Sequence, residues 1–269
     1  MTVTLTAGMR ANLFSLQQTT KMMDLTQKRM STGKKVNTAL DDPVNFFKSK
    51  DHYDRATDLA AKKDGMSEGI KTIEAANTGI EAIYDLLAQM KSLASAAKTS
   101  DNTGDLQTQF DTVRTQIANL ADDSNYGGNN LMNGDTISVE FDENGTHTLT
   151  VGSSTLKSTT AGTVANQTVS AGNFNTQTTM ETAISQIDSA VSNLRTEAQK
   201  LASNLSTISI REDFTANMIN TLNTGADKLV LADMNEEGAN MLMLQTRQAL
   251  STTSLSLSSQ AAQAVLRLF

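Results

Sequence analysis

The side chains best suited to catalysis or metal binding are few in this sequence, and they lie far apart. The two histidines are His52, in a predicted helix, and His147, in a predicted strand, and neither stands beside a second candidate base or ligand. The absence of cysteine excludes disulfides, thiolate metal sites and cysteine nucleophiles. The sequence contains neither an HExxH motif nor a glycine-rich phosphate loop after a strand. We therefore interpret both histidines as surface or packing residues.

Clustered acidic residues give the only other hint of chemistry. Residues 142–145, Asp-Glu-Asn-Gly, resemble the start of a calcium loop, but Ser153 stands where such a loop needs a bidentate glutamate. A hairpin turn explains this segment better. Asp122 and Asp123 precede a glycine pair and fit a solvated helix end. The sequence predicts no catalytic residue, no cofactor site and no metal site, and hence a protein that is not an enzyme.

Composition points to helices packed on helices. Of 269 residues only 4% are aromatic, none is tryptophan, and there is a single proline. Aliphatic, methionine-rich cores suit helical packing, and proline would interrupt helix interiors. A net charge of −7 argues against a nucleic-acid partner. No apolar run is long enough for a membrane span, and the first residues lack the basic leader and apolar region of a cleaved signal peptide.

The first predicted helix covers residues 5–32 and carries a narrow coiled-coil seam. Its apolar positions recur every seven residues. They are Met9, Leu16, Met23 and Met30, with Leu13 half a turn beyond the first. The complementary positions, Thr20 and Gln27, are polar, so we expect this helix to be marginal without a partner.

The segment 29–43 interrupts the helical pattern and contains the only proline. Gly33 can end the first helix, and Pro43 suits the first turn of the second. Asp41 and Asp42 suit the free N–H groups and the dipole at that helix start. The second helix is predicted over 43–98. Its clearest apolar positions are Met66, Ile73, Ile80 and Leu87.

The remaining chain contains two further strong helical patterns, a β-rich segment and a C-terminal arm. Apolar residues alternate by three and four between 106 and 120 and again between 180 and 208. Gly225 and Gly238 are predicted to interrupt the helical pattern of the arm. Its apolar positions are Met234, Met241, Leu244, Leu255, Ala262, Leu266 and Phe269.

Between residues 136 and 175 the period changes to two, which predicts strands. A three-residue loop at 143–145 would pair Phe141 with His147 and place both apolar stripes on one face, with Gly145 in the left-handed conformation. The expected fold is mainly α, with long helices and a small β-hairpin insertion. The two terminal arms are weak helices and should pack either against each other or against other copies.

Three segments resemble bacterial flagellins, and they occur in the family's order at both ends of the chain. The segment RMSTGKKVNTALDDP at 29–43 is similar to the family's N-terminal signature, and NYGGNNLMNG at 125–134 is similar to the segment before its variable region. Residues 229–269 resemble the family's C-terminal end, with a final Leu-Phe. Pro43 followed by NFF at 45–47 resembles the short flagellins of alphaproteobacteria.

The resemblance implies a structural subunit that polymerises into the flagellar filament, the helical propeller of swimming bacteria. It implies a long antiparallel helical bundle and coiled coil with both termini paired, and no outer domains or only vestigial ones. The paired termini would form an inner-tube coiled coil from 1–43 and 225–269, with a spoke at 33–43. The resemblance also implies an outer-tube helical domain from 44–135 and 176–224, and an exposed β-rich insertion at 136–175. The alternative is the hook–filament junction protein, which shares the terminal helices.

The implied partners are other copies of the chain, hook-associated and cap proteins, and an export chaperone at the C-terminal arm, without nucleic acid or membrane. The implied location is the extracellular filament, reached without a cleaved signal peptide. We expect the subunit interface in the two arms and the spoke. The predicted interface residues are Met9, Leu13, Leu16, Met23, Met30, Gly33, Asp41, Asp42, Pro43, Met241, Leu244, Leu255, Ala262, Leu266 and Phe269.

Overall fold

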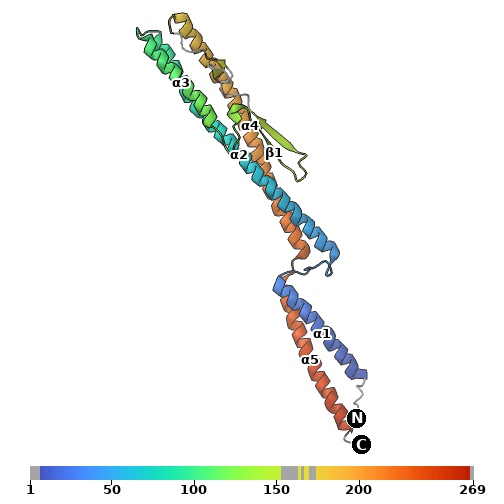
Figure 1. The fold of residues 1–269 in the computed structure, drawn as a ribbon. Coiled ribbons are helices and arrows are strands. Elements are labelled where there is room, and N and C mark those ends of the chain that lie inside the picture. Colours follow the sequence, from blue (N-terminus) through green and yellow to red (C-terminus); the bar gives the residue numbers. More distant parts are fainter. Residues whose placement is uncertain (1–6, 153–162, 165–166, 170–173, 267–269) are drawn as a thin grey trace. The chain divides into compact units, whose positions relative to one another are not determined.

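A computed structural model describes residues 7–152, 163–164, 167–169 and 174–266 (Figure 1). The chain forms two compact units, one from 1–54 with 221–269 and one from 55–220. Five α-helices account for most of the described residues, as the periodicity predicts. They are α1 (Ala7–Thr32), α2 (Pro43–Ala97), α3 (Thr103–Asp123), α4 (Gln177–Val230) and α5 (Met234–Leu266).

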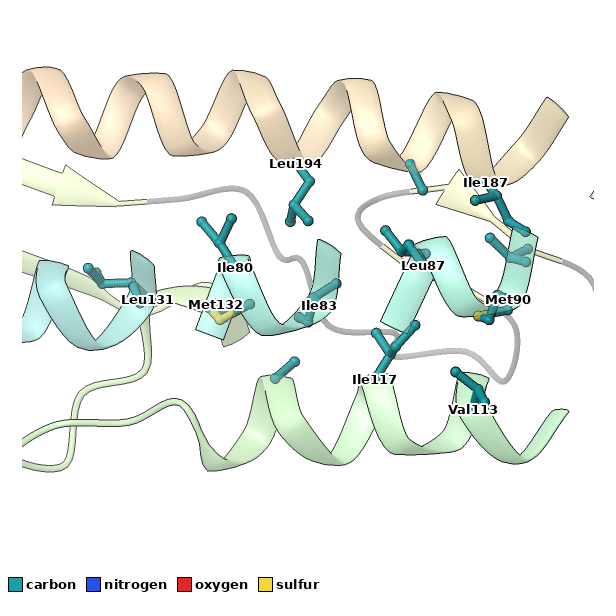
Figure 2. Packing of buried hydrophobic residues seen from close by; sticks show 14 of the residues in the cluster. Ile80, Ile83, Leu87, Met90, Val113, Ile117, Leu131, Met132, Ile187 and Leu194 are labelled. Atoms are coloured by element: carbon teal, nitrogen blue, oxygen red, sulfur yellow. The ribbon is translucent and has the colours of Figure 1, made fainter. Parts of the chain in front are cut away.

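In the unit 55–220, α2 packs between α3 and α4 and supplies the centre of the core (Figure 2). The seven-residue series that begins at Met66 and ends at Leu87 is at most 1% exposed, which confirms the predicted stripe. Ile117 on α3 and Ile187 on α4 are equally buried and face it from either side. Such burial stabilises the bundle by roughly 1.5–3 kcal/mol per large aliphatic side chain.

The predicted hairpin forms with the predicted register. β1 (Thr136–Glu140) pairs antiparallel with β2 (Thr148–Gly152), so that Val139 lies opposite Leu149 and Ile137 opposite Val151. The Phe141 amide donates to the His147 carbonyl at 2.9 Å, and Gly145 has a φ of 67°. A short 3₁₀ helix, η1 (Leu131–Asn133), precedes this hairpin, and β3 (Thr163–Val164) pairs with β4 (Gln167–Thr168).

One face of this β segment belongs to the core rather than to solvent. Val139 is 4% exposed and Val151 is fully buried against the helices. Gly69 on α2 allows the close approach, because a Cβ at that position would lie 2.7 Å from a methyl group of Val139. The segment predicted as an exposed insertion therefore has a packed inner face and an exposed outer face.

In the other unit, α1 and α5 lie side by side as an antiparallel pair (Figure 1). The Asn12 side chain donates to Ser254 at 3.1 Å near one end, and Arg29 contacts Glu237 at 3.1 Å near the other. The two terminal helices are thus paired, as expected.

The position of the polar residues in the α1 seam differs from the prediction. The seam passes over Thr19 and Thr26, which are 1% and 6% exposed, and not over Thr20 and Gln27. A three-four alternation through Leu16, Thr19 and Met23 keeps the seam on one face of the helix. The Thr19 hydroxyl donates to the Ser15 carbonyl at 2.8 Å, which satisfies its hydrogen-bonding group within the helix.

The predicted break at Gly225 is also wrong. Helix α4 continues through this glycine to Val230, and Gly238 lies within α5. A glycine costs a helix interior only about 1 kcal/mol, which packing over a long helix easily offsets. The chain instead leaves the helix at 231–233, where its backbone finds partners in the segment that follows α1.

Candidate assembly surfaces

The segment between α1 and α2 pairs with the segment between α4 and α5, and together they form a joint within the unit 1–54 and 221–269. Gly33 has a φ of 69° and donates its amide to the Arg29 carbonyl at 2.8 Å, which ends α1 as predicted. The Val230 carbonyl accepts from Lys35 at 2.8 Å. The Ala232 amide donates to the Gly33 carbonyl at 3.0 Å. Each of the two connecting segments thus supplies hydrogen-bond partners for backbone groups of the other.

Two aspartates order the turn that leads into α2. The Asp41 carboxylate accepts from the backbone amides of Asn37 at 3.0 Å and Thr38 at 2.9 Å, and from the Thr38 hydroxyl at 3.1 Å. Asp42 caps α2 by accepting from the Asn45 amide at 3.0 Å, and Pro43 begins the helix as predicted. These backbone hydrogen bonds, from Thr38 to Asp41 and from Asn45 to Asp42, lower the pKa of both carboxyl groups, which therefore stay ionised.

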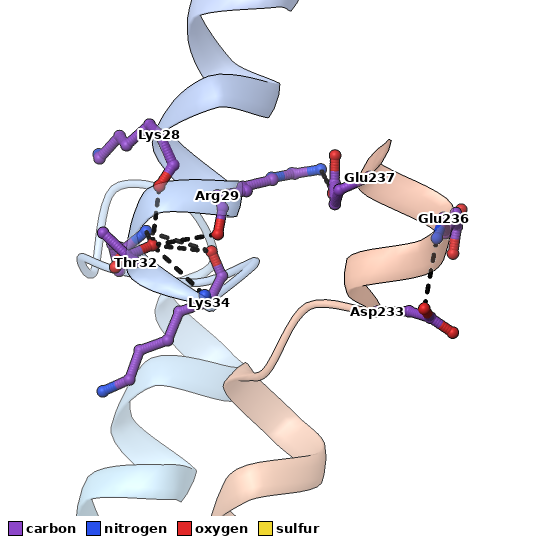
Figure 3. Close-up of polar contacts among 8 residues, drawn as sticks. Lys28, Arg29, Thr32, Lys34, Asp233, Glu236 and Glu237 are labelled. Atoms are coloured by element: carbon purple, nitrogen blue, oxygen red, sulfur yellow. Dashed lines mark hydrogen bonds and ion pairs between the residues drawn. The ribbon is translucent and has the colours of Figure 1, made fainter. Parts of the chain in front are cut away.

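Sequence reasoning missed the roles of two acidic residues, Asp233 and Glu237, where the chain enters α5. Asp233 caps α5 by accepting from the amides of Asn235 at 2.9 Å and Glu236 at 3.3 Å (Figure 3). The spacing of Asp233 and Glu236 is that of a capping box, a signal that predicts a helix start here. Glu237, with 8% of its side chain exposed, pairs with Arg29 at 3.1 Å and ties α5 to α1 (Figure 3).

Most of the predicted interface residues of the two arms lie in the seam between α1 and α5. Met9 and Leu244 are buried there, and the other described members are half-buried. These are Leu13, Leu16, Met23, Met30, Met241 and Leu255. Ala262 and Leu266 lie in α5, but their side chains are outside the described part, and Phe269 is wholly outside it. The seam residues thus pack α1 against α5 within one chain.

A second set of apolar residues remains exposed on the same two helices. On α5, Met243, Leu250 and Leu257 recur every seven residues and are 58%, 67% and 62% exposed. Phe14 on α1 is 62% exposed. The signal in the sequence is this second seven-residue stripe, offset from the seam, which the search for one stripe per helix passed over. We call Met243, Leu250 and Leu257 the outer stripe.

Two further kinds of site to consider in the described residues are a metal centre and a membrane span. No group of three or more histidine, aspartate or glutamate side chains in these ranges is arranged to hold a metal ion. The helices of the described part include none with the length and apolar character of a membrane span. A paired set of terminal helices with an additional exposed apolar stripe defines a class of protein: a helical subunit built to associate with further helices.

Comparisons with known proteins identify the family. Residues 4–136 match the model of the bacterial flagellin N-terminal helical region. Flagellin FljK of Caulobacter vibrioides is 33% identical over 98% of this chain and 96% of its own length. A flagellin of Brucella melitensis is 26% identical over 96% of this chain and 95% of its own length, and flagellin C of Rhizobium meliloti is 25% identical over 96% of both.

The chain belongs to the bacterial flagellin family. It is a structural subunit of the flagellar filament, and the three relatives named above come from alphaproteobacteria, as the residues around Pro43 indicated. Nothing in the comparisons favours the hook–filament junction protein.

Proposed function

We propose that this chain polymerises by burying the outer stripe of α5, together with Phe14 of α1, against the terminal helices of neighbouring copies. The observation that carries the proposal is the exposure of Met243, Leu250 and Leu257 at seven-residue spacing, on a helix whose other apolar stripe already faces α1. A regular apolar stripe in water is unfavourable, and helices bury such stripes against one another. Repeated contacts of this kind that do not close into a ring give a filament.

The residues first predicted as the interface have two parts in this mechanism. The seam side chains pair α1 with α5 and so orient the outer stripe. Gly33, Asp41, Asp42 and Pro43 keep the joint in one conformation, so that every copy presents the same surfaces. We assign 1–43 with 225–269 to the inner tube of the filament and 44–135 with 176–224 to the outer tube. We assign 136–175 to an insertion between these two parts of the outer tube.

The same stripe accounts for the proposed partners before and after assembly. An export chaperone that covers α5 in the cytoplasm would hide the outer stripe until the chain leaves the cell. Hook-associated and cap proteins would meet the same helices at the two ends of the filament.

The test is to remove the outer stripe without disturbing the seam. A Leu250→Ser, Leu257→Ser variant should keep the monomer's thermal unfolding, because both side chains are exposed. Its critical concentration for polymerisation, measured by sedimentation and electron microscopy, should rise at least about tenfold, since burying one leucine is worth roughly 1.5–3 kcal/mol. A Gln245→Ser, Gln260→Ser variant on exposed positions of the same helix is the control. Equal filament yields from both variants would refute the proposal.

A further inference from the structure

A well-ordered turn exposes the side chain of Leu40 to solvent. Its side chain is 96% exposed, although the turn around it is fixed by the three hydrogen bonds that Asp41 accepts from Asn37 and Thr38. An apolar side chain on a mobile loop needs no explanation, but here a rigid turn presents one to solvent. This arrangement is favourable once a partner covers the side chain.

Two further exposed apolar residues lie in the first turns of α2, shortly after Leu40 in the sequence. Val44 and Phe47 are 62% and 55% exposed, and a spacing of three places them on one face of the helix. We call Leu40, Val44 and Phe47 the joint patch. The exposed carboxylate of Asp41 lies in the same turn as Leu40, so that the patch is apolar with a negative charge beside it.

A complementary concavity lies in the unit 55–220, under the turn of the β1–β2 hairpin. This hairpin pocket has a volume of about 350 Å³. Its apolar walls are Leu59 from α2, Phe141 from the hairpin, and Phe214 and Met218 from α4. Phe214 is 55% exposed although it lines a pocket, which shows that the apolar wall is uncovered in a single chain.

The charge at the hairpin pocket is also complementary to the joint patch. The Arg211 guanidinium lies over the Phe141 ring at 5.2 Å and has no ion pair with any described residue. By contrast, the other arginine in the pocket, Arg55, is paired with Glu143 at 2.8 Å. The pocket also contains two carboxylates: Glu143 is the partner of Arg55, and Asp142 lies 3.3 Å from the His147 Nδ1. The Arg211 guanidinium is therefore available for a strong pair with a carboxylate from outside the pocket.

We infer that the joint patch of one copy seats in the hairpin pocket of a second copy, with Leu40 against Phe214 and Met218 and with Asp41 near Arg211. This inference rests on the proposed polymerisation and adds a second contact, distinct from the outer stripe. The occupant is a copy of this chain because the chain itself carries both halves: an exposed apolar patch with a carboxylate, and an uncovered apolar pocket with an unpaired cation.

Disulfide trapping tests the contact directly, because the chain has no cysteine of its own. Copies with Leu40→Cys are mixed with copies with Phe214→Cys, polymerised under reducing conditions and then oxidised. A disulfide requires Cα atoms within about 7 Å, so covalent dimers should appear in filaments and not in the unpolymerised mixture. Thr196→Cys, at an exposed position on the same helix as Phe214, replaces Phe214→Cys in the control and should give none.

The outcomes separate this contact from polymerisation itself. Filaments that form without Leu40–Phe214 dimers above the control would overturn the inference and leave the proposed function intact. Failure of the unmodified chain to form filaments would overturn both. A disulfide that forms at low concentration within a chain carrying both cysteines would assign the pocket to the chain's own patch and also overturn the inference.

A substitution without a cross-link measures how much Leu40 contributes to the free energy of polymerisation. Leu40→Ser should leave monomer unfolding unchanged, because the side chain contacts water in the single chain. It should raise the critical concentration at least about tenfold, the effect of losing one buried leucine from a contact. Leu40→Met, which keeps an apolar side chain of similar size, should polymerise like the unmodified chain. An unchanged critical concentration for Leu40→Ser would contradict the contact.

Discussion

Two glycines of α2 offer a sensitive test of the packing, because they lie in one helix but meet different surroundings. A Cβ added at Gly79 would lie 2.2 Å from the Ser124 Oγ and 2.7 Å from the Met132 Sδ. A Cβ added at Gly65 would meet nothing within 4 Å. Both changes to alanine gain the same helix propensity, about 1 kcal/mol. Only Gly79→Ala must also displace its neighbours.

The cost of that displacement follows from the surroundings of Gly79. The Ser124 hydroxyl donates to the Leu120 carbonyl at 2.7 Å, so rotating it away breaks a hydrogen bond. Its Cβ would still stand 2.8 Å from the new methyl group, and Met132 is fully buried and has little room to move. Overpacking of this kind costs about 1–3 kcal/mol. We therefore expect Gly79→Ala to be about 1–3 kcal/mol less stable than Gly65→Ala.

The measurement is urea unfolding followed by far-ultraviolet circular dichroism. Hydrogen exchange in α3 and α4 then assigns the change to the bundle. The prediction concerns the difference between the free energies of unfolding of the two variants. The gain in helix propensity is the same in both, so it cancels in this difference. Equal stabilities within about 0.5 kcal/mol would refute the close approach of α2 to the segment after α3.

Two further predictions concern charged groups. Arg29→Ala should destabilise the α1–α5 pair more than Glu237→Ala, because it leaves without a partner a carboxylate side chain that is only 8% exposed, whereas the Arg29 side chain is 34% exposed. We expect roughly 2–3 kcal/mol against about 1 kcal/mol, measured by hydrogen exchange of α5, and the reverse order would contradict the geometry. The hairpin turn should resist acid: the Thr146 hydroxyl and the His147 amide donate to Asp142 and lower its pKa from 3.8 to about 2. Its contribution to stability should be complete above pH 3.8 and disappear between that pH and about 2, as followed by exchange of hairpin amides, and Asp142→Asn should abolish this pH dependence.

Much of the fold could be predicted because local chemistry decides it. The hairpin register follows from the period of two and from Gly145, and the pairing of Val139 with Leu149 agrees. The end of α1 follows from Gly33, and the start of α2 from Asp42 and Pro43. Each of these features depends on a residue's backbone preferences or on contacts a few positions away.

The errors arose where a distant part of the chain decides the outcome. Gly225 stays helical because α4 is packed along its length. The helix instead ends before 231–233, where Gly33 and Lys35 in the segment between α1 and α2 supply hydrogen-bond partners for its backbone. The Arg29–Glu237 pair joins residues more than two hundred positions apart, and no local pattern indicates it.

The sequence by itself determined the helical periods, the break before Pro43 and the resemblance to flagellins. It left open which apolar residues face the chain's own helices and which face outward, because α5 carries apolar side chains on more than one face. Tertiary structure decided this by pairing α1 with α5 through the seam. Once that seam is buried within one chain, the outer stripe and the joint patch remain exposed for contact with further copies.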